Sequence, residues 1–223
     1  MSYTRFAIYY VPSASALADF GTAWLGWDLI CGMPVEALAI SGRYGVTASP
    51  RKYGFHGTLK PPFRLRNGYD AARLAQSVQE LAACTAPAAC TGLKLSRLGR
   101  FLALTPTGDT AALGQLASVF VTQLDAFRAP PTAQDLAKRR QRRLSERQDA
   151  NLERWGYPYV LDEFRFHLTL TGKLPKDQIE NWIAVLENAL PALAEPFEIN
   201  SVALVGERAD GQFELIERFD LTG

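Results

Sequence analysis

The chain has 223 residues, of which 48% are hydrophobic and 21% are charged, with 17 glycines and 13 prolines. This composition is typical of a globular protein and excludes a disordered, collagen-like or coiled-coil chain. Lysine and arginine number 24 against 23 aspartates and glutamates, which gives a formal net charge of +1. A surface that is basic overall, as in many nucleic-acid-binding proteins, is therefore not expected.

The N-terminal residues lack the charged and long apolar regions of a secretory signal, and no apolar stretch is long enough to span a bilayer. Cys31, Cys84 and Cys90 form no Cys-x-x-Cys pair. They favour a reducing compartment over a disulfide scaffold or a cysteine-rich zinc site. We expect a cytoplasmic protein that has no membrane partner.

In chain order, residues 5–11 predict a strand, and Ser13 or Ser15 is placed to begin a helix after it. Residues 32–52 are rich in glycine and proline and predict a loop with one short helix at 35–40.

The rest of the chain reads as two copies of the order strand, helix, strand, strand, at about 53–106 and 164–220. The strands are expected at 53–60, 92–98 and 101–105 in the first copy, and at 164–171, 197–205 and 212–219 in the second. Pro61 and Pro62 are expected to end the first of these strands. A helical connection at about 110–155 joins the copies, and we expect one bilobal domain over residues 1–223.

The two histidines of the chain, His56 and His167, lie in the first strand of each copy. Each follows phenylalanine and precedes x-Thr-Leu, as FHGTL and FHLTL. Because side chains alternate along a strand, His56 and Thr58 share one face, and His167 and Thr169 do the same in the second copy. The phenylalanine and leucine side chains point to the opposite, apolar face.

Two imidazoles and two hydroxyls around one cleft suit phosphoester chemistry. One imidazole serves as base toward water, and the other protonates the leaving alkoxide of a cyclic phosphate. The threonine hydroxyls donate hydrogen bonds to the non-bridging oxygens. The alternative role for each histidine is packing within its strand, and the identical spacing of the two motifs argues against that role.

The two motifs resemble those of the 2H phosphoesterase superfamily, whose signature is two His-x-Thr/Ser-hydrophobic strands. The flanking text, RKYGFHGTLKPPFRL and FRFHLTLTGKLP, is similar to the DUF1045 family, which is associated with bacterial phosphonate-utilisation operons. The resemblance implies an α/β (α+β) fold, bilobal and pseudo-two-fold, with two mostly antiparallel sheets around a central cleft and helices outside. It also implies that His56 and His167 are the catalytic pair and that Thr58 and Thr169 bind the phosphate.

Other residues are weaker candidates for substrate phosphate binding. Arg165 shares the face of His167, Lys60 shares the face of His56 at the strand end, and Tyr53 precedes the first motif. The ordinary alternatives are a surface salt bridge for Arg165, exposure to solvent for Lys60 and packing within the strand for Tyr53.

Residues 138–154 carry seven basic side chains against three acidic ones. Arg139, Arg143 and Arg147 recur every four residues, so one helix would place them on one face, where they repel each other unless an anion is present. The segment is a solvated helix face, a lid that brings arginine to an anionic substrate, or a contact for RNA backbone.

Two histidines without a third ligand at suitable spacing do not predict a metal site, and no Walker A or Rossmann glycine pattern is present. We therefore expect no cofactor. The preferred function is a metal-independent phosphodiesterase acting on a small cyclic phosphate, either a cyclic nucleotide or a cyclic sugar phosphate. The alternatives are a non-catalytic module that binds RNA or nucleotide phosphate, and a ligase or cyclase acting on an RNA end.

Overall fold

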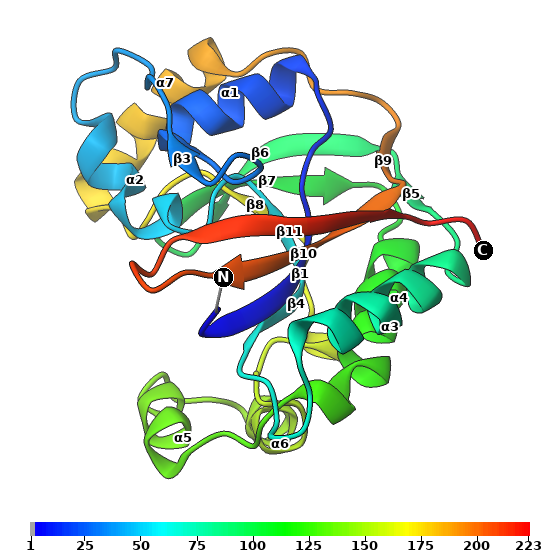
Figure 1. Cartoon of the computed structure of the whole chain (residues 1–223). Helices are drawn as coiled ribbons and strands as arrows, with labels where there is room; N and C mark the ends of the chain where they lie inside the picture. Colours follow the sequence, from blue (N-terminus) through cyan, green and yellow to red (C-terminus); the bar gives the residue numbers. More distant parts are fainter. Residues whose placement is uncertain (1–2) are drawn as a thin grey trace.

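A computed structural model describes residues 3–223, in which helices surround a seven-stranded sheet (Figure 1). All neighbouring strands of this sheet are antiparallel. In spatial order they are β11 (Phe213–Asp220), β10 (Ser201–Glu207), β1 (Arg5–Tyr10), β4 (Gly57–Phe63), β8 (Leu168–Thr169), β7 (Phe101–Thr107) and β6 (Gly92–Leu98). The α-helices are α1 (Ala16–Leu25), α2 (Arg43–Arg51), α3 (Ala71–Ala83), α4 (Ala111–Gln123), α5 (Ala133–Arg140), α6 (Glu146–Trp155) and α7 (Ile179–Ala189).

The large sheet consists of two halves that meet where Gly57 of β4 pairs with Leu168 of β8. Helices α3 and α4 pack on the half formed by β11, β10, β1 and β4, whereas α7 packs on the half that contains β6. Trp24 of α1 contacts Trp182 of α7 edge to face, with ring centroids 6.2 Å apart. The expected α/β class, with antiparallel strands and outer helices, is confirmed. The two halves are continuous through the β4–β8 pair instead of being separate sheets.

Each half of the sheet contains strands from both copies of the repeat. The first strand of copy one, β4, lies in the half that holds the final hairpin of copy two, β10–β11. The first strand of copy two, β8, lies beside the hairpin of copy one, β6–β7. The copies exchange hairpins, so the expectation that the repeat units at about 53–106 and 164–220 correspond to lobes is wrong. The element order of each copy is as the sequence indicates.

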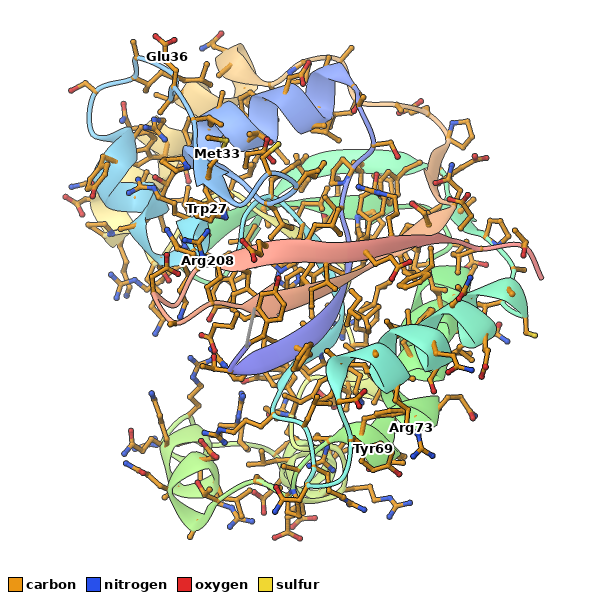
Figure 2. The ribbon with its side chains drawn as sticks, viewed as in Figure 1. Trp27, Met33, Glu36, Tyr69, Arg73 and Arg208 are labelled. Atoms are coloured by element: carbon orange, nitrogen blue, oxygen red, sulfur yellow. The ribbon has the colours of Figure 1, made fainter. Side chains whose placement is uncertain are left out.

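Two short two-stranded sheets lie outside the large one. They are β2 (Trp27–Asp28) with β3 (Met33–Pro34), and β5 (Ala88–Cys90) with β9 (Phe197–Ile199). The β2–β3 hairpin is held against the β10–β11 turn, where the Arg208 guanidinium lies 5.7 Å from the centre of the Trp27 ring (Figure 2).

Residues 35–40 form no helix, and the helix of this region is α2, whose sequence contains Gly45 and Pro50. The expected short helix is wrong because contacts with α1 decide the local structure. The Arg51 Nε donates to the Leu25 carbonyl at 2.8 Å, and Arg43 donates to the Trp24 carbonyl. These arginines satisfy carbonyls that the C-terminal end of α1 leaves without helical partners.

The motif strands also differ in length from the expectation. β4 continues through Pro61 and Pro62, whereas β8 is limited to Leu168–Thr169. The prolines are tolerated because β4 pairs with β8 only at Gly57, so the missing N–H groups break no ladder on that side. Within residues 3–223, no helix is long and apolar enough to cross a lipid bilayer.

Candidate active site

The β4–β8 junction brings both histidine motifs together. Gly57 lies opposite Leu168 in this antiparallel pair. Continuing the register by one residue in each direction sets His56 opposite Thr169, and Thr58 opposite His167. Opposed side chains of an antiparallel pair have Cβ atoms roughly 4.5–5.5 Å apart. On this register the four residues lie at the corners of one small rectangle of the sheet, related by the pseudo-two-fold axis of the repeat.

The alternation of side chains in the two motifs follows the predicted pattern. Phe55, Leu59 and Phe166 are 3%, 1% and 4% exposed and pack in the core, where Leu168 and Leu170 are fully buried. The histidines and threonines of both motifs keep partial exposure. One face of the junction is thus apolar and packed, and the other presents polar groups to solvent.

His56 is held by hydrogen bonds on both ring nitrogens. Its Nδ1 lies 2.9 Å from the Gly54 carbonyl oxygen, and its Nε2 lies 3.0 Å from the Thr58 hydroxyl. A carbonyl only accepts, so Nδ1 carries the proton and the Thr58 hydroxyl donates to Nε2. Burial lowers the pKa of His56 to about 4, with the Gly54 carbonyl opposing the shift and nearby His167 adding to it. His56 is neutral at pH 7.

Gly54 has a structural reason to be glycine. Its φ is +68°, and a Cβ on it would lie 2.6 Å from the Cβ of Leu29. A side chain there would displace the carbonyl that fixes the His56 tautomer.

His167 repeats this geometry in the second motif. Its Nδ1 donates to the Arg165 carbonyl at 2.8 Å, so each histidine bonds the carbonyl two residues before it. Burial lowers the pKa of His167, and the Arg165 carbonyl opposes the shift. In both motifs Nε2 is the nitrogen left for chemistry. Two neutral imidazoles with defined tautomers can exchange protons with a bound ligand.

Two tyrosines flank His56. The Tyr9 ring of β1 stacks on the imidazole, with centroids 3.7 Å apart and planes inclined by 22°. Tyr53 lies 6.1 Å from the same imidazole, at a tilt of 48°. Tyr53 was a sequence candidate, and it does lie beside His56. Tyr9 was not a candidate, because nothing in the apolar run of residues 5–11 distinguishes it.

Lys60 does not share the face of His56, and that expectation is wrong. Tyr9 pairs with Thr58 but Ile8 pairs with Lys60, so a bulge at Leu59 reverses the alternation. Lys60 is 2% exposed, and its Nζ donates to the Val121 carbonyl at 2.8 Å, near the C-terminal end of α4. Burial lowers its pKa to about 8. The ammonium therefore caps a helix and does not reach the polar face of the junction.

The basic segment is two helices, α5 and α6, and not one (Figure 1). Arg139, Arg143 and Arg147 consequently do not form one helical face. Arg143 lies in the intervening turn with φ +51°, and Arg147 forms an ion pair with Asp162. Both are exposed, as is Arg165, the candidate for phosphate binding near His167.

Arg139 is placed differently from the other two candidates of this segment. Its guanidinium lies 4.6 Å from the centre of the Tyr157 ring. Burial is the main cause of the raised pKa of Tyr9, and the phenol groups of Tyr53 and Tyr157 add to it, so both lie within electrostatic range of Tyr9. Arg139 is thus connected to the surroundings of His56 through Tyr157.

Arg139 also lines an open hollow of about 80 Å³ near the N-terminal end of β1. Four guanidinium side chains border it, those of Arg5, Arg64, Arg128 and Arg139. Three of the four have a carboxylate partner: Glu207 for Arg5, Asp135 for Arg64 and Asp125 for Arg128. Asp135 itself lines the hollow, so the four arginines and their three carboxylate partners leave one net positive charge, that of Arg139.

The fold and the junction define a bilobal α/β protein with two symmetry-related His-x-Thr motifs. Residues 58–214 match the family described as "Protein of unknown function (DUF1045)", and the chain belongs to this family. A relative from Janthinobacterium sp. (strain Marseille), named Ribose 1,5-bisphosphate phosphokinase PhnN, is 41% identical over 179 residues. A protein of the same name from Laribacter hongkongensis (strain HLHK9) is 34% identical over 186 residues.

The matched regions cover 78% and 81% of this chain but 40% and 43% of the relatives, so the chain spans less than half of their length. Similar solved structures include TT0787 of Thermus thermophilus, at 15% identity over 98% of both chains with a TM-score of 0.45. E. coli LigT complexed with 3'-AMP has 14% identity over 100% of both chains and a TM-score of 0.45.

Proposed function

We propose that this protein is a phosphodiesterase that opens a small cyclic phosphate by two-histidine general acid–base catalysis, with no metal. The observation that carries the proposal is the pairing of Gly57 of β4 with Leu168 of β8, because continuing this register sets His56 opposite Thr169 and Thr58 opposite His167. A phosphorus atom above this pair has an imidazole on each side and a hydroxyl beside each imidazole.

In this mechanism the Nε2 of one histidine accepts a proton from water while the water oxygen forms a bond to phosphorus. The ring P–O bond breaks, and the protonated Nε2 of the other histidine gives its proton to the leaving alkoxide. Both imidazoles are neutral in the free protein because burial lowers their pKa values. The negative charge of the bound phosphate raises the pKa of the histidine that becomes the acid.

The threonine hydroxyls stabilise charge on the non-bridging oxygens. Thr58 donates to His56 Nε2 in the ligand-free structure. On binding, this hydroxyl is expected to turn to a phosphate oxygen, which frees Nε2 for proton transfer.

We propose a phosphorylated ribose as the substrate class, within phosphonate metabolism. The names of the two relatives support this choice, since they specify a ribose bisphosphate. The arginine-lined hollow supports it as well. Arg5 and Tyr9 are four residues apart on one face of β1, or about 13 Å along the strand. The two phosphates of one ribose are closer together than this, so with the cyclic phosphate at the histidines the long side chains of Arg5 and Arg139 would have to extend toward the second phosphate.

The test is phosphorus NMR of the purified protein with cyclic ribose phosphates and nucleoside 2′,3′-cyclic phosphates. Wild type is expected to convert one of them to a monoester. His56→Ala and His167→Ala are each expected to lower kcat by at least about 10²-fold, and Thr58→Val and Thr169→Val by roughly 10–10³-fold. A folded histidine variant with near-wild-type turnover overturns the mechanism. Binding without conversion of any substrate would instead indicate a phosphate-binding module. Joining of RNA ends would indicate a ligase.

The role of the hollow is tested by Arg139→Gln, with Lys138→Gln as the matched control. Lys138 is an exposed cation one residue away on the same helix, and it does not line the hollow. Arg139→Gln is expected to raise KM for the doubly phosphorylated substrate by about tenfold and the control by less than twofold. Equal KM values in both variants contradict a substrate contact at Arg139.

A further inference from the structure

Tyr9 and Ala103 occupy equivalent positions in the two halves of the pseudo-symmetric site. On β1, Tyr9 lies opposite Thr58 of the first motif. On β7, Ala103 lies opposite Thr169 of the second. Each of these residues therefore stands next to a motif strand and shares the face of its histidine. The duplication is broken here, because one motif has a large ring and the other has a methyl group.

The difference changes the surroundings of the two imidazoles. His56 stacks nearly face to face on the Tyr9 ring with centroids 3.7 Å apart, closer than the roughly 4.5–7 Å of most aromatic pairs. The aromatic ring beside His167 is that of Phe101, 5.8 Å away at a tilt of 53°. His56 therefore rests on a flat surface, whereas His167 does not.

Tyr9 is itself rigidly held. It is 1% exposed on β1, which is hydrogen-bonded on one side to β10 and on the other to β4. The Phe213 ring packs against it with centroids 6.1 Å apart. A ring fixed by two neighbouring strands leaves the imidazole above it little freedom to rotate.

We propose that Tyr9 is a positioning residue, whose ring holds the His56 imidazole with Nδ1–H on the Gly54 carbonyl and Nε2 toward the polar face. The contact acts through His56, and the Tyr9 hydroxyl takes no part. Rotation of the imidazole by half a turn about Cβ–Cγ would put Cδ2 at the Gly54 carbonyl and Cε1 where Nε2 lies, so both nitrogen contacts would be lost. Stacking on Tyr9, with the Gly54 bond, opposes this rotation.

The ring also controls the solvation of His56. One face of the imidazole is covered by Tyr9, and burial is the largest cause of its lowered pKa. The other titratable groups near it are Tyr53 and His167, and of these only His167 contributes to the shift. Removing the Tyr9 ring therefore admits water to His56, and its pKa is expected to return toward 6.5.

The direct test is NMR of the protein labelled with 15N-histidine. The chain has only two histidines, so only two imidazoles give signals. His56→Ala assigns the signals. In wild type, His56 is expected to keep the Nδ1–H tautomer and to titrate near pH 4. Tyr9→Leu is expected to raise the His56 pKa by one unit or more and to mix the tautomers, whereas Tyr9→Phe retains both properties. His167 serves as the internal control in every variant.

Tyr9→Leu with an unchanged His56 pKa and tautomer overturns the proposal. Because Tyr9→Leu removes a buried ring and is at risk of misfolding, wild type gives an independent measurement. The carbon-bound protons of the His56 imidazole lie over an aromatic face, so they are expected upfield of those of His167. The absence of this upfield shift overturns the proposal without any variant.

The consequence for turnover rests on the proposed function. Tyr9→Leu is expected to lower kcat by at least about tenfold with KM within threefold and to move one limb of the pH profile, while Tyr9→Phe stays within twofold of wild type. The NMR result does not depend on turnover. If the imidazole responds to Tyr9 as expected but no cyclic phosphate is opened, the proposed function fails and the positioning role stands.

Discussion

Gly57 is the position at which a single methyl group should disturb both motifs. A Cβ on Gly57 would lie 2.4 Å from Cζ and 2.5 Å from Cε2 of Phe166, where ordinary contact begins at 3.4 Å. The ring or the strand must therefore move by about 1 Å. Phe166 is 4% exposed and packed between Tyr10 and Phe197, with centroids 6.0 and 5.7 Å away, so the ring has no free space to enter.

Gly57→Ala is therefore expected to overpack the β4–β8 junction at a cost of about 1–3 kcal/mol in the free energy of unfolding. For a chain of this size, that lowers Tm by roughly 2–12 °C. Because Phe166 directly precedes His167, a shift of about 1 Å at the junction is also expected to lower kcat by about 10²-fold. Calorimetry measures the first effect, and phosphorus NMR turnover measures the second.

Gly114→Ala is the matched control for this substitution. No atom lies within 4 Å of a Cβ at this position of α4, so alanine is expected to raise stability by about 0.5–1 kcal/mol and to leave kcat unchanged. Adding Phe166→Leu to Gly57→Ala removes the outer ring atoms and is expected to restore part of the lost activity. A Gly57→Ala protein with wild-type Tm and kcat would refute the steric reasoning.

Three further predictions concern protons and metals. The pKa of His56 is about 4 in the folded protein against an ordinary value of 6.5, so the unfolded state binds the proton first as pH falls. In urea unfolding, the free energy of unfolding of wild type should fall by roughly 3 kcal/mol more than that of His56→Gln between pH 7 and pH 4. Equal decreases in the two proteins contradict this. Lys60→Met should keep turnover within twofold. Because the Lys60 pKa is lowered to about 8, wild type should gain stability relative to Lys60→Met as pH rises from 8 to 10.5, and a flat difference contradicts its burial. Exhaustive chelation should leave turnover within twofold, and loss that zinc or manganese restores contradicts a two-imidazole mechanism.

Local patterns predicted the parts of this fold that depend on nearby residues. The alternation of FHGTL and FHLTL placed the histidines and threonines on one face because a two-residue period needs no knowledge of the partner strand. Ser15 caps α1 for the same reason, since it accepts a hydrogen bond from the N–H of Ala18, three residues later.

Register and long-range contacts explain what the sequence did not reveal. Lys60 changes face because of a bulge against β1, and a bulge is set by the pairing of two strands. α2 forms despite Gly45 and Pro50 because Arg43 and Arg51 bond the end of α1. The break between α5 and α6 occurs without a proline or glycine between Arg140 and Glu146, and its one local signal is the capping box of Ser145 and Gln148 that begins α6.

Because the two copies exchange hairpins, the site can form only when both halves of the fold are complete. Neither copy can cover its own helix with its own strands, because β10 and β11 lie under α3 and β6 lies against α7. Each half therefore needs both copies before it can bury its apolar face. The two halves then meet at Gly57 and Leu168, and this one pair sets the spacing of His56 and His167. A change that loosens this junction is thus expected to separate the imidazoles before it unfolds either half, and activity should be lost ahead of the cooperative transition.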